Sequence, residues 1–446
     1  MHTTKSIYIV NKPVNDLKPD PRNARVHSKK QIEVLARAIK SFGFNNPVLI
    51  DRDGMIIAGH GRIEAAKLIG MMEVPTVCLE HLTPEQVRAY RIADNRIAEL
   101  ASWNEDLLRI EFQELSVLNL DFNITDTGFD TPQIDIMIMG DSAPNTESLE
   151  DVPDITLAYN LPVISRLGDI WQLGKHRIVC GDSLLPETYQ HLIEGDKAGL
   201  IFTDPPYNVP INGHVLTENK NHSHDEFVMA SGEMTQAEFQ QFLRTVSKLM
   251  VEYSQDGSLH FICMDWRHIY DLLHAATPLY SELKNICIWN KTNGGMGSLY
   301  RSKHEMIALF KNGKTPHTNN IELEKHGRYR TNVWDYAGQN IPTEERLEAL
   351  TMHPTVKPVK MIEDAIYDCS HRGDIILDPF GGSGSTLIAA EKAGRCARLI
   401  EISPRYVDVT IQRWQKLTGS DAVEHNSGKT FNALTEERGG YCYVRK

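Results

Sequence analysis

The feature that most constrains the fold is a glycine-rich stretch between residues 373 and 393. An apolar run there ends at Asp378 and is followed by a proline, three closely spaced glycines and a helical pattern. Glycines after a strand let the backbone approach a ligand closely and open a helix toward it. The next apolar run ends at Glu401, where an acid is placed to accept hydrogen bonds from both hydroxyls of a ribose. The pattern predicts an α/β domain with a ligand site at the carboxyl ends of its strands.

A second apolar run, residues 198–202, leads to Asp204, Pro205, Pro206 and Tyr207. The prolines fix φ and remove two backbone donors, so the carbonyl oxygens there are held while the acid and the aromatic ring project in a defined geometry. This combination suits a site that holds the amino group of a nucleobase while the base stacks on the ring. Taken alone, the four residues are equally typical of a loop turn, and the glycine-rich stretch downstream favours the chemical interpretation.

Three segments carry a resemblance to a known family. Residues 204–207 resemble the catalytic motif of amino-directed DNA methyltransferases, which transfer the methyl group of S-adenosylmethionine to adenine N6 or cytosine N4. Residues 378–384 resemble the S-adenosylmethionine motif of these enzymes, and residues 352–358 resemble their H-P-T-x-K-P segment. The catalytic motif comes first, which is the permuted order called the β group. The resemblance covers about residues 166–419 and implies a seven-stranded α/β methyltransferase fold.

The same resemblance implies the site residues. Asp204 and the carbonyl of Pro205 would accept the two amino hydrogens of a flipped base, and Lys357 would supply a cation near the methionine part of the cofactor. Residues 303–311 resemble a strand that these enzymes carry near the target base. No metal and no catalytic cysteine are expected. The predicted catalytic residues are Asp204, Pro205, Pro206 and Tyr207, and the predicted cofactor-binding residues are Asp182, Lys357, Asp378, Phe380, Gly381, Gly382, Ser383, Gly384, Ser385 and Glu401.

Residues 1–100 form a separate unit in the sequence. Residues 29–42 have helical spacing and end at a glycine, and residues 47–57 predict a hairpin with Asp-Gly in its turn. A glycine loop then brings Arg62 to the start of a second helix, where a phosphate could bind. The unit resembles the α+β ParB/sulfiredoxin-like domain, whose loop handles nucleotide or DNA phosphates. A DNA-contacting or assembly module and a nucleotide hydrolase or nuclease both remain open, and the glycines also suit a plain tight turn.

The charge of the chain is unevenly distributed. The net charge is −12 over 446 residues, and residues 101–160 hold one basic residue against thirteen acidic ones. Residues 284–360 hold twelve Lys and Arg against seven Asp and Glu, which suits a surface facing phosphates as well as an ordinary solvated surface. The global acidity therefore does not exclude double-stranded DNA as a partner. The predicted DNA-binding residues are Arg62, Lys303, Arg328 and Arg330.

The domain plan follows these boundaries. We expect a ParB-like domain at 1–100, a helical and acidic linker at 101–160, a methyltransferase domain at 161–419 with target recognition at about 284–352, and a weakly ordered tail at 420–446. Seven cysteines without a C-x-x-C pair suggest reduced thiols and a cytoplasmic location. No apolar run of about 18 residues occurs, so no membrane span is expected. A homodimer is left open.

The predicted reaction is methylation of adenine N6 in duplex DNA by base flipping. Adenine is favoured because the cytosine enzymes of the resembling family more often have serine where Asp204 stands. Enzymes that act on glutamine in proteins usually have asparagine there. N4-cytosine methylation and a non-enzymatic DNA-binding regulator remain as alternatives. Nothing in the sequence suggests a restriction activity within the same chain.

Overall fold

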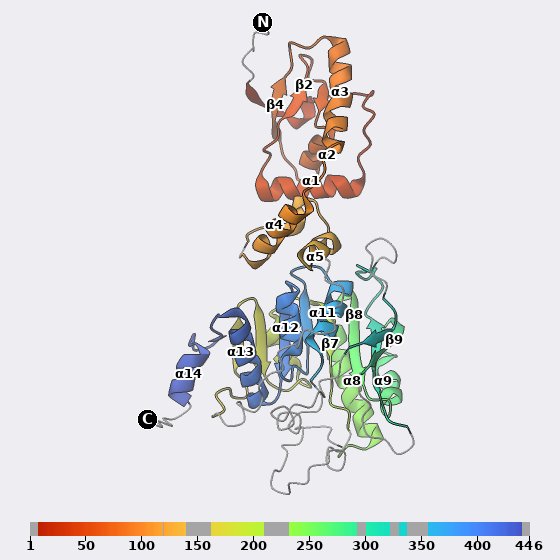
Figure 1. Cartoon of the computed structure of the whole chain (residues 1–446), viewed down its shortest axis with the longest axis vertical. Coiled ribbons are helices and arrows are strands. Elements are labelled where there is room, and N and C mark those ends of the chain that lie inside the picture. The colour runs from red at the N-terminus through yellow and green to blue at the C-terminus, as the bar shows by residue number, and fades with distance from the viewer. Residues whose placement is uncertain are drawn as a thin grey trace. The chain divides into compact units, whose positions relative to one another are not determined.

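The computed structural model describes residues 8–118, 120–139, 162–208, 232–291, 300–321, 330–336 and 356–438. The chain divides into two compact units, Met1–Ser142 and Ala143–Lys446 (Figure 1). Each unit has its own sheet and its own hydrophobic core.

The first unit is built on a four-stranded sheet in the order β1-β4-β2-β3. The predicted hairpin is present, since β2 and β3 pair antiparallel, and Gly54 in its turn has φ of 77°. The first predicted helix also has its expected bounds, because the Ser28 hydroxyl caps its start and Gly43 ends it with φ of 86°. The elements are β1 (Ile9–Pro13), η1 (Val14–Asp16), α1 (Lys29–Phe42), β2 (Val48–Ile50), β3 (Ile56–Ala58), α2 (His60–Leu68), β4 (Glu73–Cys78) and α3 (Pro84–Glu99).

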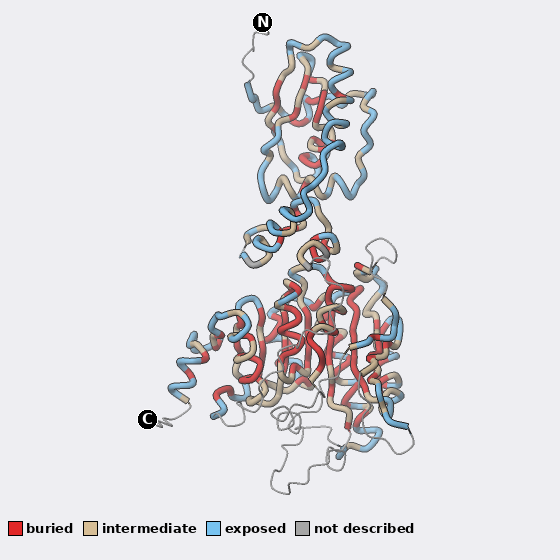
Figure 2. Tube along the Cα trace, in the orientation of Figure 1, coloured by how far each residue is buried: buried red, intermediate tan, exposed pale blue. Residues whose placement is uncertain are grey.

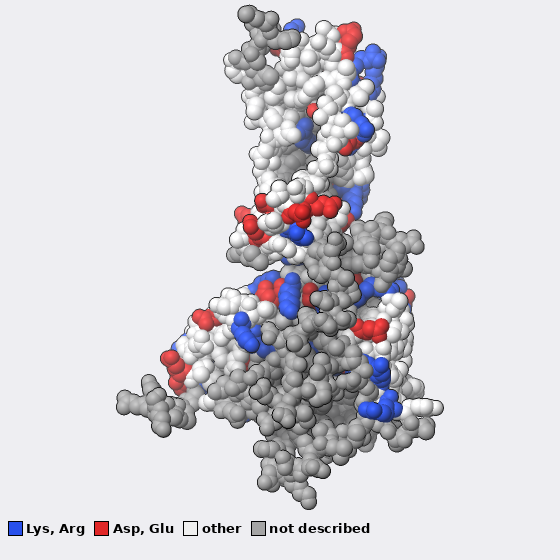
Figure 3. All heavy atoms as spheres, in the orientation of Figure 1, with Lys and Arg blue, Asp and Glu red and all other residues white. Residues whose placement is uncertain are grey.

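The segment expected to be a linker contains a small helical cluster. It consists of α4 (Glu105–Val117), η2 (Ile124–Thr127) and α5 (Thr131–Met139), packed around Phe112, Ile124 and Ile134. Asp126 in η2 accepts a hydrogen bond from the Ser41 hydroxyl on α1 at 2.6 Å, which ties the cluster to the ParB-like part. Part of the acid excess of the sequence lies on the exposed side of α4, where carboxylates gather (Figure 3). The exposed acids of α4 are Glu105, Asp106, Glu111 and Glu114.

The second unit contains a ten-stranded sheet in the order β11-β9-β10-β8-β7-β12-β13-β6-β5-β14. Its inner seven strands, from β9 to β6, are the predicted seven-stranded methyltransferase fold. The five strands β6, β13, β12, β7 and β8 run parallel, and β10 lies antiparallel between β8 and β9. The strands are β5 (Ile170–Leu173), β6 (His176–Cys180), β7 (Ala198–Thr203), β8 (Ser254–Met264), β9 (Glu282–Asn290), β10 (His304–Lys311), β11 (Val333–Asp335), β12 (Ile375–Asp378), β13 (Cys396–Glu401) and β14 (Val423–Glu424).

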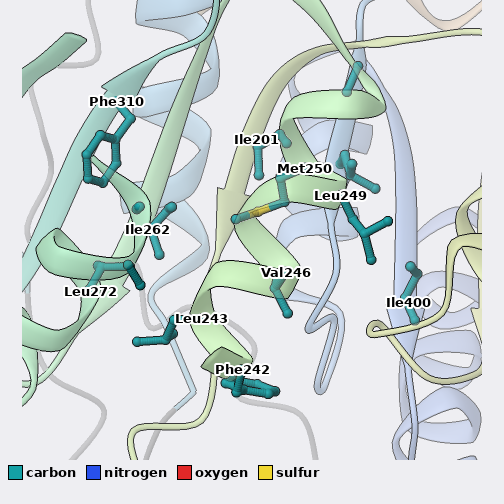
Figure 4. Close-up of a cluster of buried hydrophobic side chains, with 14 of the residues drawn as sticks. Ile201, Phe242, Leu243, Val246, Leu249, Met250, Ile262, Leu272, Phe310 and Ile400 are labelled. Carbon is teal, nitrogen blue, oxygen red and sulfur yellow. The ribbon is translucent and has the colours of Figure 1, made fainter. Parts of the chain in front are cut away.

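Helices cover the sheet and bury its central strands (Figure 2). One core cluster joins side chains of the strands to α7 (Pro186–Ile193), α8 (Gln236–Glu252) and α9 (Ile269–Ala276). Figure 4 shows its centre, where Ile201 of β7 and Ile262 of β8 meet the apolar side of α8. The helices α11 (Val359–Cys369), α12 (Ser385–Lys392) and α13 (Pro404–Thr418) contact β6, β7, β12 and β13. The positions from Leu200 to Phe202 in the central strand β7 are all apolar and buried, as the sequence predicts for a strand covered on both faces.

The residues after 419 are more ordered than the sequence suggests. Strand β14 pairs with β5, and α14 (Phe431–Arg438) buries Phe431 and Leu434. The ring of Phe431 lies 5.4 Å from that of Trp171, centroid to centroid. A two-residue strand and a short helix carry too little periodicity to be recognised from sequence. No helix among the described residues is both long enough and apolar enough to cross a bilayer.

Candidate active site

Three neighbouring strands end at the same edge of the large sheet, and each brings an acid there. Strands β7, β12 and β13 are adjacent and parallel, so their carboxyl ends meet. Asp204 follows β7, Asp378 ends β12 and Glu401 ends β13. This is the edge where open α/β sheets bind ligands. The structure therefore brings the two sequence motifs together, as their positions at strand ends predict.

Asp204 lies in a buried cluster of charged and hydroxyl groups. The ammonium of Lys357 donates to its Oδ2 at 2.5 Å, and the Tyr207 hydroxyl donates to its Oδ1. Lys357 also pairs with Oε2 of Glu305 on β10 at 3.0 Å. The other oxygen of Glu305 pairs with Lys291, which follows β9. Two carboxylates and two ammonium groups thus balance one another in a site where the Lys357 side chain is only 4% exposed.

The electrostatics of the cluster follow from burial and pairing. Burial raises the pKa of Asp204, because a desolvated carboxylate disfavours its charge, while Lys357 opposes this rise. Burial also acts to raise the pKa of Glu305, but Lys357 and Lys291 outweigh it and hold that pKa at about 2. Burial acts to lower the pKa of Lys357, and Asp204 and Glu305 reverse the direction so that it is raised. Lys357 is therefore a permanent cation in this site.

The prolines of the tetrad shape the same loop. Pro205 is buried and Pro206 is half-buried, directly after the buried end of β7. Asn208 follows with φ of 54° and is buried. Its side-chain oxygen accepts the backbone N–H of Gly232 at 3.0 Å and that of Met234 at 3.2 Å. The loop that carries Asp204 is thus fixed at both ends.

Asp378 braces the glycine loop rather than pointing an unpaired carboxylate outward. It accepts hydrogen bonds from Thr203 Oγ1 at 2.8 Å, from the Phe380 N–H at 3.1 Å and from Thr386 Oγ1 at 2.6 Å. Thr203 directly precedes Asp204, so Asp378 joins the loop that carries Asp204 to the glycine loop. Burial raises the pKa of Asp378 to about 6, against these donors.

Glu401 lies beside the glycine loop. Its Oε2 accepts the Gly382 N–H and its Oε1 accepts the Ser403 N–H, both at 2.8 Å. Burial raises the pKa of Glu401 to about 7. Asp182 lies nearby, because β6 pairs with β13, and it accepts the Leu184 N–H at 2.8 Å in a turn.

The glycine loop passes close to its neighbours. A β-carbon at Gly381 would lie 2.9 Å from the Leu399 side chain, and one at Gly384 would lie 2.6 Å from Thr410. Gly382 and Gly384 both have positive φ. The carbonyl of Ser383 accepts from Arg413 at 2.6 Å, and the buried Oγ of Ser385 has no hydrogen-bond partner among the described residues. Phe380 packs on Phe242, with ring centroids 5.9 Å apart.

These features fit S-adenosylmethionine. The close backbone, the start of α12 and the acid of Glu401 suit its methionine and ribose parts, and the unpartnered Ser385 hydroxyl offers one more polar contact. The residues that would hold it are those of the glycine loop, 378–385, together with Glu401 and Asp182.

Lys357 contacts two acids of the site. The sequence predicts that it serves the carboxylate of the cofactor, and this stays a prediction; its ammonium contacts Asp204 and Glu305 in the structure. Sequence reasoning did not identify Glu305 or Lys291. The available signal was the segment 303–311, in which Glu305 is the one acid of an otherwise apolar and basic strand.

The predicted DNA-binding residues have different surroundings. Arg330 is anchored inside the fold, where its guanidinium pairs with Asp368 at 2.8 Å and donates to the Tyr336 hydroxyl at 3.0 Å, so the structure does not support it as a DNA contact. The sequence does not predict this ion pair, because Asp368 lies on α11, 38 positions further along the chain. Lys303 is exposed at the start of β10. Arg62 is half-buried and folds over Gly59, and burial lowers its pKa. Arg328 lies outside the described residues.

No group of three or more histidine, cysteine or acidic side chains suited to a metal ion occurs in the part of the chain that the structure describes.

Comparison with known proteins agrees with this geometry. Residues 198–412 match the DNA methylase family of N6 and N4 enzymes, residues 2–95 match the ParB N-terminal domain, and residues 106–166 match the ParB-methyltransferase HTH domain. The last match covers α4, η2 and α5.

Individual relatives match one unit or the other. The ParB-like nuclease domain-containing protein YnaK of Escherichia coli (strain K12) is 48% identical over 83 residues, which are 19% of this chain and 95% of YnaK. The type II methyltransferase M.HinfI of Haemophilus influenzae is 28% identical over 240 residues, which are 50% of this chain and 65% of that protein. The solved complex of M1.HpyAVI with S-adenosylmethionine covers 53% of this chain and 98% of its own, with 20% identity and a TM-score of 0.37.

The fold and the site define a methyltransferase that uses S-adenosylmethionine and acts on the amino group of a DNA base. More narrowly, the chain belongs to the N6/N4 DNA methylase family and carries an N-terminal ParB-like domain.

Proposed function

We propose that this DNA methylase transfers its methyl group to adenine N6 in duplex DNA. The observation that carries the proposal is the state of Asp204, whose two oxygens both receive hydrogen bonds from donors in a buried site. A carboxylate held in this way is built to accept N–H donors, and the amino group of adenine or of cytosine offers two. The choice of adenine rests on the aspartate itself, because the cytosine enzymes of the family more often carry serine there.

In the proposed reaction, Asp204 and the Pro205 carbonyl accept the two amino hydrogens of a base flipped out of the duplex. These two hydrogen bonds would fix the direction of the nitrogen lone pair, which lowers the entropic part of the activation barrier to methyl transfer. S-adenosylmethionine, when bound, would supply the electrophilic methyl group and leave as the thioether S-adenosylhomocysteine, while the amino nitrogen would lose one proton toward Asp204. Thr203 and Asp378 keep the acceptor and the glycine loop at a fixed separation through their 2.8 Å hydrogen bond.

Tyr207 is proposed as the surface on which the base stacks. In the structure its hydroxyl is bonded to Asp204, and the same oxygen lies 3.2 Å from Glu305. An entering base therefore competes with the hydroxyl for Asp204. Glu305 is close enough to accept the hydroxyl if it is displaced.

The contribution of the first unit is proposed to be DNA contact through Arg62 at the start of α2. Lys303, which is exposed in the second unit, is proposed to meet phosphates as well, and such contacts position a protein on DNA without reading its sequence. The target recognition segment is proposed to lie within residues 284–352, of which the structure describes 284–291, 300–321 and 330–336.

The proposal is tested by incubating the protein with labelled S-adenosylmethionine and unmodified duplex DNA, followed by digestion and mass spectrometry of the nucleosides. N6-methyladenine is the expected product. N4-methylcytosine would overturn the choice of base and keep the enzyme class. Asp204→Ala is expected to abolish the label while leaving cofactor binding intact, and full activity in that variant would contradict the role of Asp204. Absence of both label and cofactor binding in the natural protein would favour a non-enzymatic regulator.

A further inference from the structure

The acceptor that the reaction needs is already occupied in the structure. Oδ2 of Asp204 receives the Lys357 ammonium, and Oδ1 receives the Tyr207 hydroxyl. An incoming amino group must compete with these two donors for the carboxylate, and it can approach most closely when one of them moves away. A donor that leaves a buried acceptor must find another, because an unpaired buried polar group is strongly disfavoured.

Both donors share a second acceptor. Oε2 of Glu305 lies 3.0 Å from the Lys357 ammonium and 3.2 Å from the Tyr207 hydroxyl. Glu305 is fixed in place by β10 and by Lys291, which pairs with its other oxygen. The side chains of Lys357 and Glu305 are 4% and 9% exposed, so water offers little alternative. Glu305 can therefore hold both donors without any large movement.

We propose that Lys357 and Glu305 form a positioning pair, in which Lys357 occupies Asp204 while no base is bound and moves onto Glu305 when the target amino group arrives. The inference rests on the proposed function. In the absence of a base, the pair keeps a buried carboxylate ionised and ready. In its presence, Glu305 retains the cation close by, so Asp204 accepts the amino hydrogens as an anion rather than as a neutral acid.

The proposal makes the pH dependence of the reaction the decisive readout. A protonated Asp204 is a weaker acceptor for the amino hydrogen, so we expect the rate to fall below the pH at which this group ionises. Removing the Lys357 cation leaves Asp204 buried without its nearest positive charge, which favours its neutral form. Among the described residues, the titratable and charged groups that act on Asp204 are Tyr207 in its own loop, Cys263 on β8, Glu305 on β10, Lys357 before α11 and Asp378 on β12, and Lys291 after β9 acts through Glu305.

The experiment measures kcat and KM for DNA methylation between pH 5.5 and about 9.5 in the full-length protein, together with the Kd of S-adenosylmethionine. For Lys357→Met we expect the acid limb of kcat/KM to move up by about 1 to 3 pH units, with activity recovering at high pH and cofactor affinity unchanged. Lys357→Arg is expected to return the limb toward its natural position. For Glu305→Gln we expect kcat to fall about tenfold or more and the acid limb to stay or move down, because Lys357 then remains on Asp204.

The acid limb is thus expected to move up in Lys357→Met and not in Glu305→Gln, a difference that a general loss of structure does not produce. Lys416→Met, on the exposed side of α13, is the matched control and is expected to leave both profiles unchanged. If Lys357→Met weakens cofactor binding without moving the acid limb, Lys357 serves the cofactor and the inference is overturned while the proposed function stands. If Lys357→Met does not fold, an unchanged kcat in Glu305→Gln overturns it instead. If the natural protein makes no methylated base, both proposals fall together.

Discussion

Glu401 carries a carboxyl group whose ionisation changes in the neutral range, because burial raises its pKa to about 7. The predicted role of this acid is to accept the ribose hydroxyls of the cofactor, and an ionised carboxylate accepts better than a protonated one. The ionised fraction rises from about one tenth at pH 6 to about nine tenths at pH 8 for such a pKa. We expect the Kd of S-adenosylmethionine to fall about ninefold over this range, as measured by titration calorimetry.

The control for this prediction is Glu401→Gln, which keeps the shape of the side chain and cannot ionise. Its Kd is expected to be weaker than that of the natural protein at pH 8 and nearly independent of pH. A natural protein whose affinity is the same at pH 6 and pH 8 would show that Glu401 serves only the backbone N–H groups of Gly382 and Ser403.

Tyr207 combines a ring and a hydroxyl whose contributions can be separated. Loss of the ring in Tyr207→Ala is expected to weaken stacking of the flipped base by about 1 to 3 kcal/mol, seen as a fall in kcat/KM for DNA. Tyr207→Phe keeps the ring and removes the donor on Asp204, so we expect kcat/KM within about threefold of the natural value, well above that of Tyr207→Ala. Equal losses in the two variants would mean that the hydroxyl, and not the ring, is what the reaction requires.

At this scale the sequence predicted the acid and the aromatic ring but not their partners. Asp204 and Tyr207 stand in a motif only four residues long. The contact of Asp204 with Lys357 joins residues 153 positions apart, and that of Tyr207 with Glu305 joins residues 98 positions apart. Such contacts depend on which strands become neighbours, and no local pattern encodes that choice.

At the scale of elements, the glycine loop before α12 is the segment that we expect to tolerate substitution least. Gly384 has φ of 83° and would place a β-carbon 2.6 Å from Thr410. Gly384→Ala therefore combines about 1–2 kcal/mol of backbone strain with about 1–3 kcal/mol of overpacking. We expect a loss of about 2–5 kcal/mol in the free energy of unfolding, measured by denaturant titration, together with loss of cofactor binding.

Gly373 is a matched control, since it has φ of 81° with no atom within 4 Å of its would-be β-carbon. Gly373→Ala should show the backbone strain alone, about 1–2 kcal/mol, and should keep cofactor binding. Comparable losses of stability in both variants would mean that strain, and not the approach of α13, sets the requirement for glycine.

The elements themselves were predictable where their periodicity is long. Strands β7 and β12, helix α1 and the β2–β3 hairpin have the places that their apolar patterns and glycines predict. The order of β8, β10 and β9 was not predictable, because β10 enters between two strands that precede it in the chain. The pairing of β14 with β5 was missed for a related reason, since two residues give no pattern and only Phe431 packing on Trp171 fixes them.

At the scale of the whole molecule, the net charge of −12 is unevenly distributed along the chain. Much of the acid excess lies in residues 101–160, of which the helical cluster α4, η2 and α5 is part. The residues proposed to meet DNA belong to other segments. A single net charge therefore says little about DNA binding by a chain of two units, because screening limits each charge to its own neighbourhood of about 8–10 Å.

The two separate cores lead to a prediction for the intact chain. Val48 and Ile63 belong to the core of the first unit, while Ile201 and Phe242 belong to that of the second. Because each core can be lost without opening the other, calorimetry is expected to show two unfolding transitions. A ligand stabilises only the unit that binds it, by about 2.7 kcal/mol at a hundredfold excess over Kd. S-adenosylmethionine should therefore raise the melting temperature of one transition by roughly 5 °C and leave the other in place. Gly384→Ala should abolish this shift without moving the second transition. A single transition that moves as a whole would show instead that the ParB-like and methyltransferase units unfold together, and that cofactor binding is felt throughout the chain.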